Sequence, residues 1–295
     1  MIFCVFLDPQ SVSKLSRMGG IGADALIGIF RVILGNCLLA ETTDWRTGQE
    51  LRDAVKAIEN QDTRKLIFSL LEKLWELQRF VDILDVDEKD DDLTTAAVAL
   101  RNRSHPCLDA IITETAGTLP SGKVEVTSVD RFHGSDFAAR CQQAKFGLSL
   151  PRGVITSSDF FHKHLSRILL VEGRFEIYDS VIGREFGDNF YHNLPWWIDF
   201  LRQSKRDIEL VIHTEGYQTG KIQDRLDGLC DDTQITPTVI RHGESSLPHE
   251  RYLKTPAFTL NLGRGIDLFD PRTGTNRDLF LTFAPRVDLP AAPHS

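Results

Sequence analysis

The sequence is poor in cysteine, and its cysteines form no metal-binding or redox motif. Five cysteines are scattered along 295 residues, and no two of them make a C-x-x-C pair. An odd, unclustered set of this kind predicts reduced thiols and indicates neither a zinc site nor a disulfide framework. These residues are Cys4, Cys37, Cys107, Cys141 and Cys230.

A long uninterrupted apolar run is also lacking. The run 2–7 is too short for the core of a signal peptide, and no basic leader precedes it. The apolar region 23–40 is interrupted by Arg31 and Asn36, which favours a buried helix followed by a strand over a membrane span. We therefore expect a cytoplasmic protein without a transmembrane segment.

An excess of positive charge is the third absence. The chain has 34 Lys and Arg against 42 Asp and Glu, a formal net charge of −8. This balance excludes a protein that binds nucleic acid over its whole surface, but it leaves room for a local basic patch. With 41% hydrophobic and 26% charged residues, the composition is that of a soluble globular protein. The length is sufficient for two domains of roughly 100–200 residues.

Strands and helices alternate in the first half of the chain. The apolar run 1–7 ends at Asp8-Pro9 and is typical of a buried parallel strand, and a second strand is expected over 36–40, ending at Glu41. The acidic run 85–93 is expected to be a solvated linker or helix cap. This pattern predicts a mainly parallel, three-layer α/β domain over residues 1–150. The expected helices are 23–34, 47–58, 64–84 and 94–101, with 64–84 the most strongly periodic.

The second half repeats this alternation after a turn signal at Leu150-Pro151-Arg152-Gly153. Apolar segments at 174–183, 207–216 and 234–243 are expected to be strands, and the segments between them helices. The helix expected first covers 160–173. A β-hairpin is expected within 247–269, and a last strand at 277–287 is expected to close the sheet. The predicted second domain spans residues 155–290.

The segment 247–269, LPHERYLKTPAFTLNLGRGIDLF, carries the clearest motif. It resembles the H-x-K-x4-D-x6-G motif of the phospholipase D superfamily, with His249 at the first position. Arg251 stands where that motif has Lys, and Pro256 where it has Asp. The resemblance implies that His249 is a nucleophile for phosphorus and that the basic residue holds phosphate oxygens. An arginine can hold phosphate bidentately, whereas a proline orients nothing.

The region 159–287 also resembles the phospholipase-D-like domain at the C-terminus of MIT-domain proteins of the ESCRT pathway. The resemblance rests on FEIYDSVIG, which contains Asp179, and on the GRGID run that begins at Gly263. Two alternatives follow from it. His249, Arg251 and Arg264 would form a phosphate-binding site without catalysis. Alternatively, two copies of His249 would meet in a homodimer, with Asp267 or Glu250 replacing the missing acid.

The first half resembles a PIN-type ribonuclease domain in the order of its acidic residues. Acids at the carboxyl ends of neighbouring parallel strands meet at one sheet edge, where they can hold Mg²⁺ or Mn²⁺. The resemblance identifies Asp8, Glu41, Asp109 and Asp130 as the metal-binding and catalytic acids. A turn or helix-capping role with Pro9 is the alternative for Asp8.

Two histidines lie near the ends of expected strands in the second half of the chain. His213 ends one strand and His242 ends the next along the chain. Sites form at such strand ends in α/β sheets, and His242 can supply a second imidazole near His249. The alternatives are a satisfied structural histidine for His213 and a turn residue for His242.

Both resemblances are to families that handle phosphodiesters, and this shared substrate class leads to the expected function. The first hypothesis is a cytoplasmic nucleic-acid-processing protein that cuts RNA or DNA with a divalent metal, of a kind found in prokaryotic conflict or anti-phage defence systems. The second is a non-enzymatic adaptor whose second domain binds a protein partner or an acidic membrane. The third is a dimeric phospholipase-D-type nuclease that uses His249.

Overall fold

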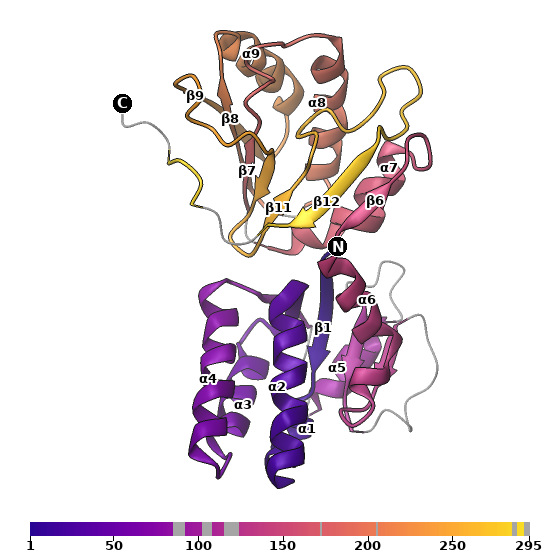
Figure 1. The fold of residues 1–295 in the computed structure, drawn as a ribbon, viewed down its shortest axis with the longest axis vertical. Coiled ribbons are helices and arrows are strands. Elements are labelled where there is room, and N and C mark those ends of the chain that lie inside the picture. The colour runs from indigo at the N-terminus through magenta and orange to yellow at the C-terminus, as the bar shows by residue number, and fades with distance from the viewer. Residues whose placement is uncertain are drawn as a thin grey trace. The chain divides into compact units, whose positions relative to one another are not determined.

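A computed structural model describes residues 1–84, 92–101, 108–114, 124–171, 173–204, 206–284 and 288–291. Within it the chain divides into two compact units, residues 2–145 and residues 146–295, the latter joined by Met1 (Figure 1). Each unit contains one β-sheet with helices, so the predicted α/β class is confirmed. Most of the acidic run predicted as a linker lies outside the described residues.

The first unit is built on a five-stranded sheet in the order β3-β2-β1-β4-β5. Every pairing in it is parallel, as the alternation of strands and helices predicts. The central strand β1 is buried at all five positions, because neighbouring strands and helices cover it on every side. The strands are β1 (Phe3–Leu7), β2 (Cys37–Thr42), β3 (Phe80–Leu84), β4 (Ala110–Ile112) and β5 (Glu125–Thr127).

Four helices of this unit form a contiguous group beside the sheet. Helices α1 to α4 contact one another and lie on one side of β1 in Figure 1. Helix α2 meets the length and composition of a membrane span, and it packs against α1, α4 and α6. The helices are α1 (Pro9–Ser16), α2 (Gly19–Asn36), α3 (Arg46–Lys56), α4 (Gln61–Glu76), α5 (Leu93–Arg101) and α6 (Asp136–Lys145).

The prediction of one helix over 64–84 is wrong in its last third. Helix α4 ends at Glu76, and the chain turns through Gln78, whose φ of 52° lies in the left-handed region. Strand β3 then pairs with β2 from Phe80 onward. Apolar residues at three- and four-residue spacing continue across this turn, so periodicity alone does not separate the helix from a short buried strand.

The second unit contains a seven-stranded mixed sheet in the order β6-β12-β11-β10-β7-β8-β9. Strands β7, β8 and β9 are parallel, and the remaining pairings are antiparallel. The strands are β6 (Leu148–Leu150), β7 (Arg174–Tyr178), β8 (Ile208–Glu215), β9 (Ile235–His242), β10 (Tyr252–Lys254), β11 (Thr259–Asn261) and β12 (Leu279–Phe283). Its α-helices are α7 (Ser157–Phe160), α8 (Asp188–Leu201) and α9 (Thr219–Cys230).

Two predictions for this unit need correction, and one is confirmed. The helix expected over 160–173 is broken into α7, a π-helical turn at Phe161–Leu165 and a 3-10 turn at Ser166–Leu170. The last strand does not close the sheet, because β12 lies between β11 and the edge strand β6. The hairpin expected in the motif segment is confirmed as β10 and β11.

Candidate functional site

The motif of the second unit lies at the carboxyl edge of the parallel strands β7 to β9. Strand β10 starts at this edge and runs back along β7, with Tyr252 opposite Tyr178. The register therefore places Arg251 beside Asp179, the first residue after β7. Ligands of α/β proteins bind at this end of parallel strands, so the position suits a site.

Asp179 is the buried anchor of this region. Its side chain has no exposed surface and accepts hydrogen bonds from the backbone N–H groups of Val181 and Ile182, at 3.0 and 3.3 Å, and of Ile266, at 3.0 Å. Burial raises the pKa of this carboxyl, while Arg251 and the three N–H donors act in the opposite direction. Asp179 thus ties β7 to the GRGID loop.

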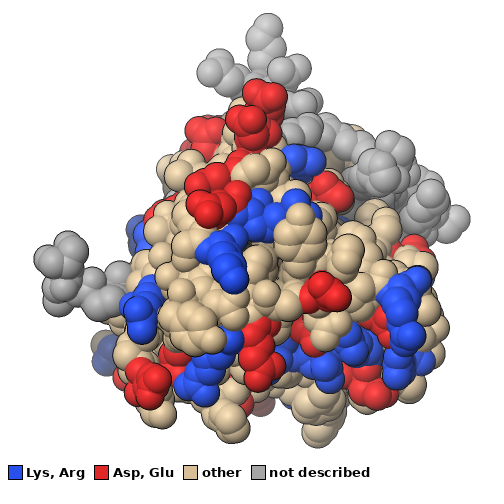
Figure 2. Space-filling view, turned by 90° about the horizontal axis from the view of Figure 1, so that it is seen from above, with Lys and Arg blue, Asp and Glu red and all other residues tan. Residues whose placement is uncertain are grey.

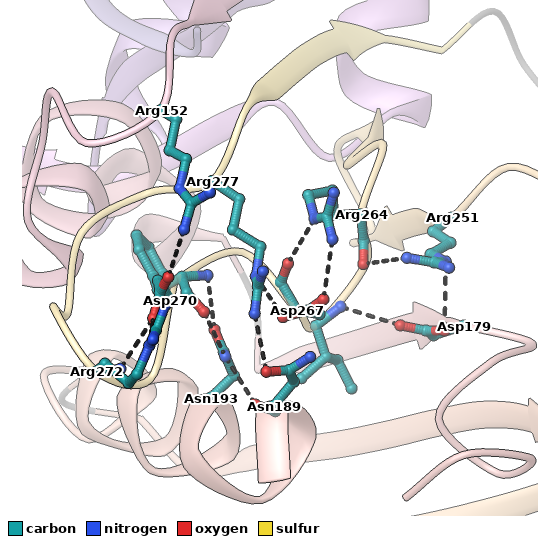
Figure 3. Close-up of polar contacts among 12 residues, drawn as sticks. Arg152, Asp179, Asn189, Asn193, Arg251, Arg264, Asp267, Asp270, Arg272 and Arg277 are labelled. Carbon is teal, nitrogen blue, oxygen red and sulfur yellow. Dashed lines mark hydrogen bonds and ion pairs between the residues drawn. The ribbon is translucent and has the colours of Figure 1, made fainter. Parts of the chain in front are cut away.

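Arg251 completes this anchor. Its Nε lies 3.5 Å from Asp179 Oδ1, and its Nη1 donates to the carbonyl oxygen of Arg264 at 2.6 Å (Figure 3). Gly265 allows the backbone of its loop to lie close to Asp179, because a Cβ at this position would be 2.2 Å from Asp179 Oδ2. The structure therefore brings Arg251 and the Arg264 backbone together.

Arg264 belongs to a second set of ion pairs, which is centred on Asp267. Its Nη2 lies 3.2 Å from Asp267 Oδ2, and 40% of its side chain is exposed. Arg277 binds the other oxygen of Asp267 at 3.0 Å and donates to Asn189 at 2.8 Å (Figure 3). Because Arg277 already neutralises Asp267, the exposed guanidinium of Arg264 can turn toward an anion without leaving a buried carboxylate unpaired.

His249 stands apart from this network. It is exposed in the loop between β9 and β10, two residues before the partly buried Arg251. Pro256, at the motif position of the acid, follows β10 and carries no side-chain acceptor. His249 is exposed and Arg264 is partly exposed, so both side chains are accessible to an anion, but Pro256 supplies no acid to orient the imidazole.

The structure also brings His213 and His242 together. His213 Nδ1 lies 2.9 Å from His242 Nε2, and the His213 ring stacks on Tyr178 at 4.2 Å between centroids. His213 Nε2 is buried and has no hydrogen-bond partner within the described chain; Glu176 Oε2 is 3.9 Å away. Burial lowers the pKa of His213 to about 4, so the ring is neutral at pH 7. This geometry favours a structural pair.

In the first unit, Asp8 occupies the carboxyl end of β1 as predicted, and it also caps α1. Its Oδ1 accepts from Gln10 N at 2.9 Å, and its Oδ2 accepts from the hydroxyls of Ser11 and Thr113, both at 2.8 Å. The side chain therefore links β1, α1 and the end of β4. The capping role weighed from the sequence is present.

Glu41 is directed into the first turn of α3. It is fully buried, and its carboxylate accepts from the backbone N–H groups of Thr42, Thr47 and Gly48 at 2.7, 2.9 and 2.7 Å. A carboxylate suits this place, because the N–H groups of a helix N-terminus lack partners inside the helix. Burial raises the pKa of Glu41, although these hydrogen bonds lower it.

The two remaining predicted acids lie far apart. Asp109 precedes β4, and its Oδ2 accepts from Cys4 N at 2.8 Å, near the amino end of β1. Asp8 follows Cys4 by four residues along the extended chain, which corresponds to a separation of about 13 Å at 3.3 Å per residue. Asp130 follows β5 at the carboxyl edge, where it is exposed. The structure thus does not gather the four predicted ligands, because Asp109 lies at the opposite edge.

Glu50, on α3, was missed by the sequence reasoning. Partial burial raises its pKa, and the negative charges of Asp8 and Asp44 add to the rise while Arg46 opposes it. Asp8 and Asp44 therefore both lie within electrostatic reach of Glu50. Within the described residues, no three His, Cys, Asp or Glu side chains are placed to share a metal ion. The four residues predicted to hold Mg²⁺ or Mn²⁺ are therefore not placed together as one set.

No protein-family description matches the chain, and no curated protein matches it. The site must therefore be judged on its chemistry. On the face of the molecule in Figure 2, acidic and basic side chains are interspersed, and neither sign covers a large area. Anion binding on such a surface depends on individual arginines placed by the fold and not on a broad basic field.

Proposed function

We propose that this chain binds nucleic-acid phosphodiesters in the cytoplasm, through the carboxyl edge of β7 to β9 in the second unit. The observation that carries the proposal is the hydrogen bond from Arg251 Nη1 to the Arg264 carbonyl at 2.6 Å, made two residues after the exposed His249. This contact keeps the two basic parts of the motif side by side. Nucleic acid is the favoured ligand because both halves of the sequence resemble families that handle phosphodiesters.

Binding without cleavage by this site is favoured over phospholipase-D-type catalysis. Attack on phosphorus needs an activated nucleophile, and activation of a histidine needs a partner that fixes its tautomer. Pro256 supplies no such group. Of the two substitutes considered from the sequence, Asp267 is already paired with Arg264 and Arg277, and Glu250 is exposed.

A binding titration with matched arginine variants tests the proposal. Arg264→Ala removes the exposed motif arginine, and Arg202→Ala is its control. Arg202 is 44% exposed and pairs with Asp199 at 3.2 Å, three residues away, so it matches Arg264 in exposure and in ion pairing. Fluorescence anisotropy with labelled RNA, DNA and duplex in EDTA gives the affinities over a range of salt concentrations.

Loss of one phosphate contact reduces the slope of log affinity against log salt by about 0.7 to 0.9. We expect this reduction for Arg264→Ala, and not for Arg202→Ala. Equal behaviour of Arg264→Ala and Arg202→Ala would contradict the proposal. Binding to vesicles that contain phosphatidylserine, with no binding to any oligonucleotide, would favour the adaptor function instead.

A metal-dependent nuclease in the first unit is the second candidate. The observation in its favour is the position of Asp8 and Asp44 just beyond the carboxyl ends of β1 and β2, where both charges raise the pKa of Glu50. It requires ligands other than the four predicted, since Asp109 lies at the opposite edge. Cleavage of a labelled oligonucleotide that needs Mn²⁺ and is lost in Glu50→Gln, but kept in Asp109→Asn, would support it. Cleavage that survives EDTA and is lost in His249→Ala would instead support the dimeric phospholipase-D-type nuclease.

A further inference from the structure

Two tryptophans of the first unit, Trp45 after β2 and Trp75 on α4, contact each other at a tilted angle while remaining open to solvent. Trp45 and Trp75 have ring centroids 5.2 Å apart at an interplanar angle of 38°. They are 44% and 39% exposed, respectively. Trp75 in turn contacts the buried Phe80 at 4.8 Å. The three rings form a chain of tilted contacts that runs from the buried Phe80 to the surface, and Trp45 is the most exposed of them.

Trp45 is held in an unusual backbone conformation. Its φ of 63° and ψ of 25° lie in the left-handed region, which residues other than Gly, Asn and Asp rarely adopt. The residue lies between β2 and α3, where a glycine would meet no such penalty. A bulky aromatic residue at this position points to a use for the exposed ring.

The inner ring is fixed by its neighbours. A Cβ at Gly48 would lie 2.7 Å from Trp75 Cζ3, so the absence of a side chain there makes room for the indole. Arg52 lies over the same ring, with its guanidinium carbon 5.7 Å from the centroid and 45% of its side chain exposed. The platform is therefore preorganised, and it has a cation beside it.

We infer that Trp45 and Trp75 form a stacking platform for the bases of single-stranded nucleic acid. An unpaired base has a flat π face that can stack on the exposed ring of Trp45. Arg52 can then contact a phosphate or a second base. The neighbours of Trp45 are exposed and polar, namely Thr43, Asp44 and Gln49. These polar neighbours favour a ligand with polar edges over an aliphatic peptide.

The inference rests on the proposed nucleic-acid binding and adds a contact that is made with unpaired bases alone. The platform also adjoins the edge that carries Asp8 and Glu50, because β2 and β1 are parallel neighbours and Trp45 N bonds to Thr42 O at 3.0 Å. A base stacked on Trp45 would bring the adjoining phosphodiester to that edge. RNA and DNA share this base chemistry, so the two are distinguished by experiment.

The test uses the full chain in EDTA with 12-nucleotide single strands of RNA and DNA and a blunt DNA duplex. Trp45→Gly removes the ring and leaves a residue that adopts φ of 63° freely, so this variant is expected to fold. Trp45→Phe keeps an aromatic ring. Ile21→Ala, at a residue 80% exposed in the same unit, is the control for loss of exposed apolar surface.

We expect Trp45→Gly to weaken single-strand binding about tenfold, with Trp45→Phe within about threefold of the wild-type protein. The duplex affinity should not change, and a 2-aminopurine in the strand should lose its quenching in Trp45→Gly alone. Equal single-strand affinity of Trp45→Gly and the wild-type protein, with Arg264→Ala still weakened, would overturn this inference but not the proposed function. Failure of the wild-type protein to bind any strand would overturn both.

Discussion

Arg251 Nε lies 3.5 Å from Oδ1 of Asp179, a residue with no exposed surface. In the motif resemblance Arg251 is the residue that holds phosphate, but in the structure it also compensates a buried charge. Arg264, with its larger exposed fraction, is therefore the better residue for direct contact with an anion. The two arginines of the motif have different tasks, and their substitution should have different effects.

The first prediction concerns stability. Arg251→Ala leaves Asp179 buried without its cation, which typically lowers the free energy of unfolding by about 3 kcal/mol or more. Arg264→Ala should change it by less than about 1 kcal/mol, because its pair is partly exposed and Asp267 keeps Arg277. Urea unfolding followed by circular dichroism measures both. Asp179→Asn in the Arg251→Ala background should recover part of the loss, and no recovery would argue against a charge effect.

The second prediction separates backbone conformation from space at two glycines. Gly263 and Gly265 have φ values of 63° and 65°, so alanine is strained equally at both positions. At Gly265 the new Cβ would also lie 2.2 Å from Asp179 Oδ2, whereas at Gly263 the nearest atom is Phe280 O at 3.1 Å. We expect Gly265→Ala to reduce stability by about 1–3 kcal/mol more than Gly263→Ala. Equal thermal midpoints would show that the loop moves freely away from Asp179.

The fold could be predicted from the sequence where pattern and composition agree. The fully apolar β1 and the helix α5 were expected close to their observed bounds, because β1 is buried on all sides and α5 is regular. Helix α1 was not expected, although Asp8 and Pro9 form a capping signal for it. The short strand β6 was also missed, since its pairing with β12 depends on residues more than 120 positions away.

The third prediction concerns pH. Because burial lowers the pKa of His213 from 6.5 to about 4, the unfolded chain binds a proton at a higher pH than the folded chain does. Stability is therefore complete above pH 6.5 and is lost as the pH falls toward 4, by about 3 kcal/mol at most. Glu176 favours the protonated ring, whereas His242, Arg174 and Lys254 oppose it. An NMR titration of the ring proton measures this, and a midpoint near 6.5 would contradict it.

The pH dependence of unfolding provides an independent check on the same histidine. His213→Phe can still stack on Tyr178, but it has no titrating group, so the slope of stability against pH between 6.5 and 4 should decrease. His242, whose pKa is also lowered by burial, is expected to account for the remaining slope. An unchanged slope in His213→Phe would assign the whole effect to other groups.

The candidate site could be predicted only in part. The H-x-R and GRG elements do meet, because spacing along a hairpin is a local property and β10 and β11 are joined by a short turn. The four acids do not meet, because their convergence depends on which end of each strand they occupy. Asp109 precedes the apolar residues of β4 whereas Asp8 follows those of β1, so the two acids lie at opposite ends of parallel strands.

The last prediction tests whether Glu41 is structural or binds metal. Glu41→Ala would leave the buried N–H groups of Thr42, Thr47 and Gly48 without an acceptor, so we expect a loss of about 3 kcal/mol in the free energy of unfolding. Glu41→Gln keeps one acceptor oxygen and removes a buried carboxyl whose pKa is raised by burial. This variant should therefore lose less free energy of unfolding than Glu41→Ala. Glu50→Ala, at an exposed residue of the same edge, is the matched control and should change stability by less than about 0.5 kcal/mol.

The same variants decide between the two roles when Mn²⁺ is added. If Glu41 only caps α3, its loss lowers the thermal midpoint by the same amount with and without the ion. If Glu41 is a metal ligand, any stabilisation of the wild-type protein by Mn²⁺ should disappear in Glu41→Gln, because a bound ion stabilises only the state that binds it. The four hydrogen bonds that Glu41 accepts from Thr42, Thr47 and Gly48 favour the first outcome, since they already occupy both carboxylate oxygens.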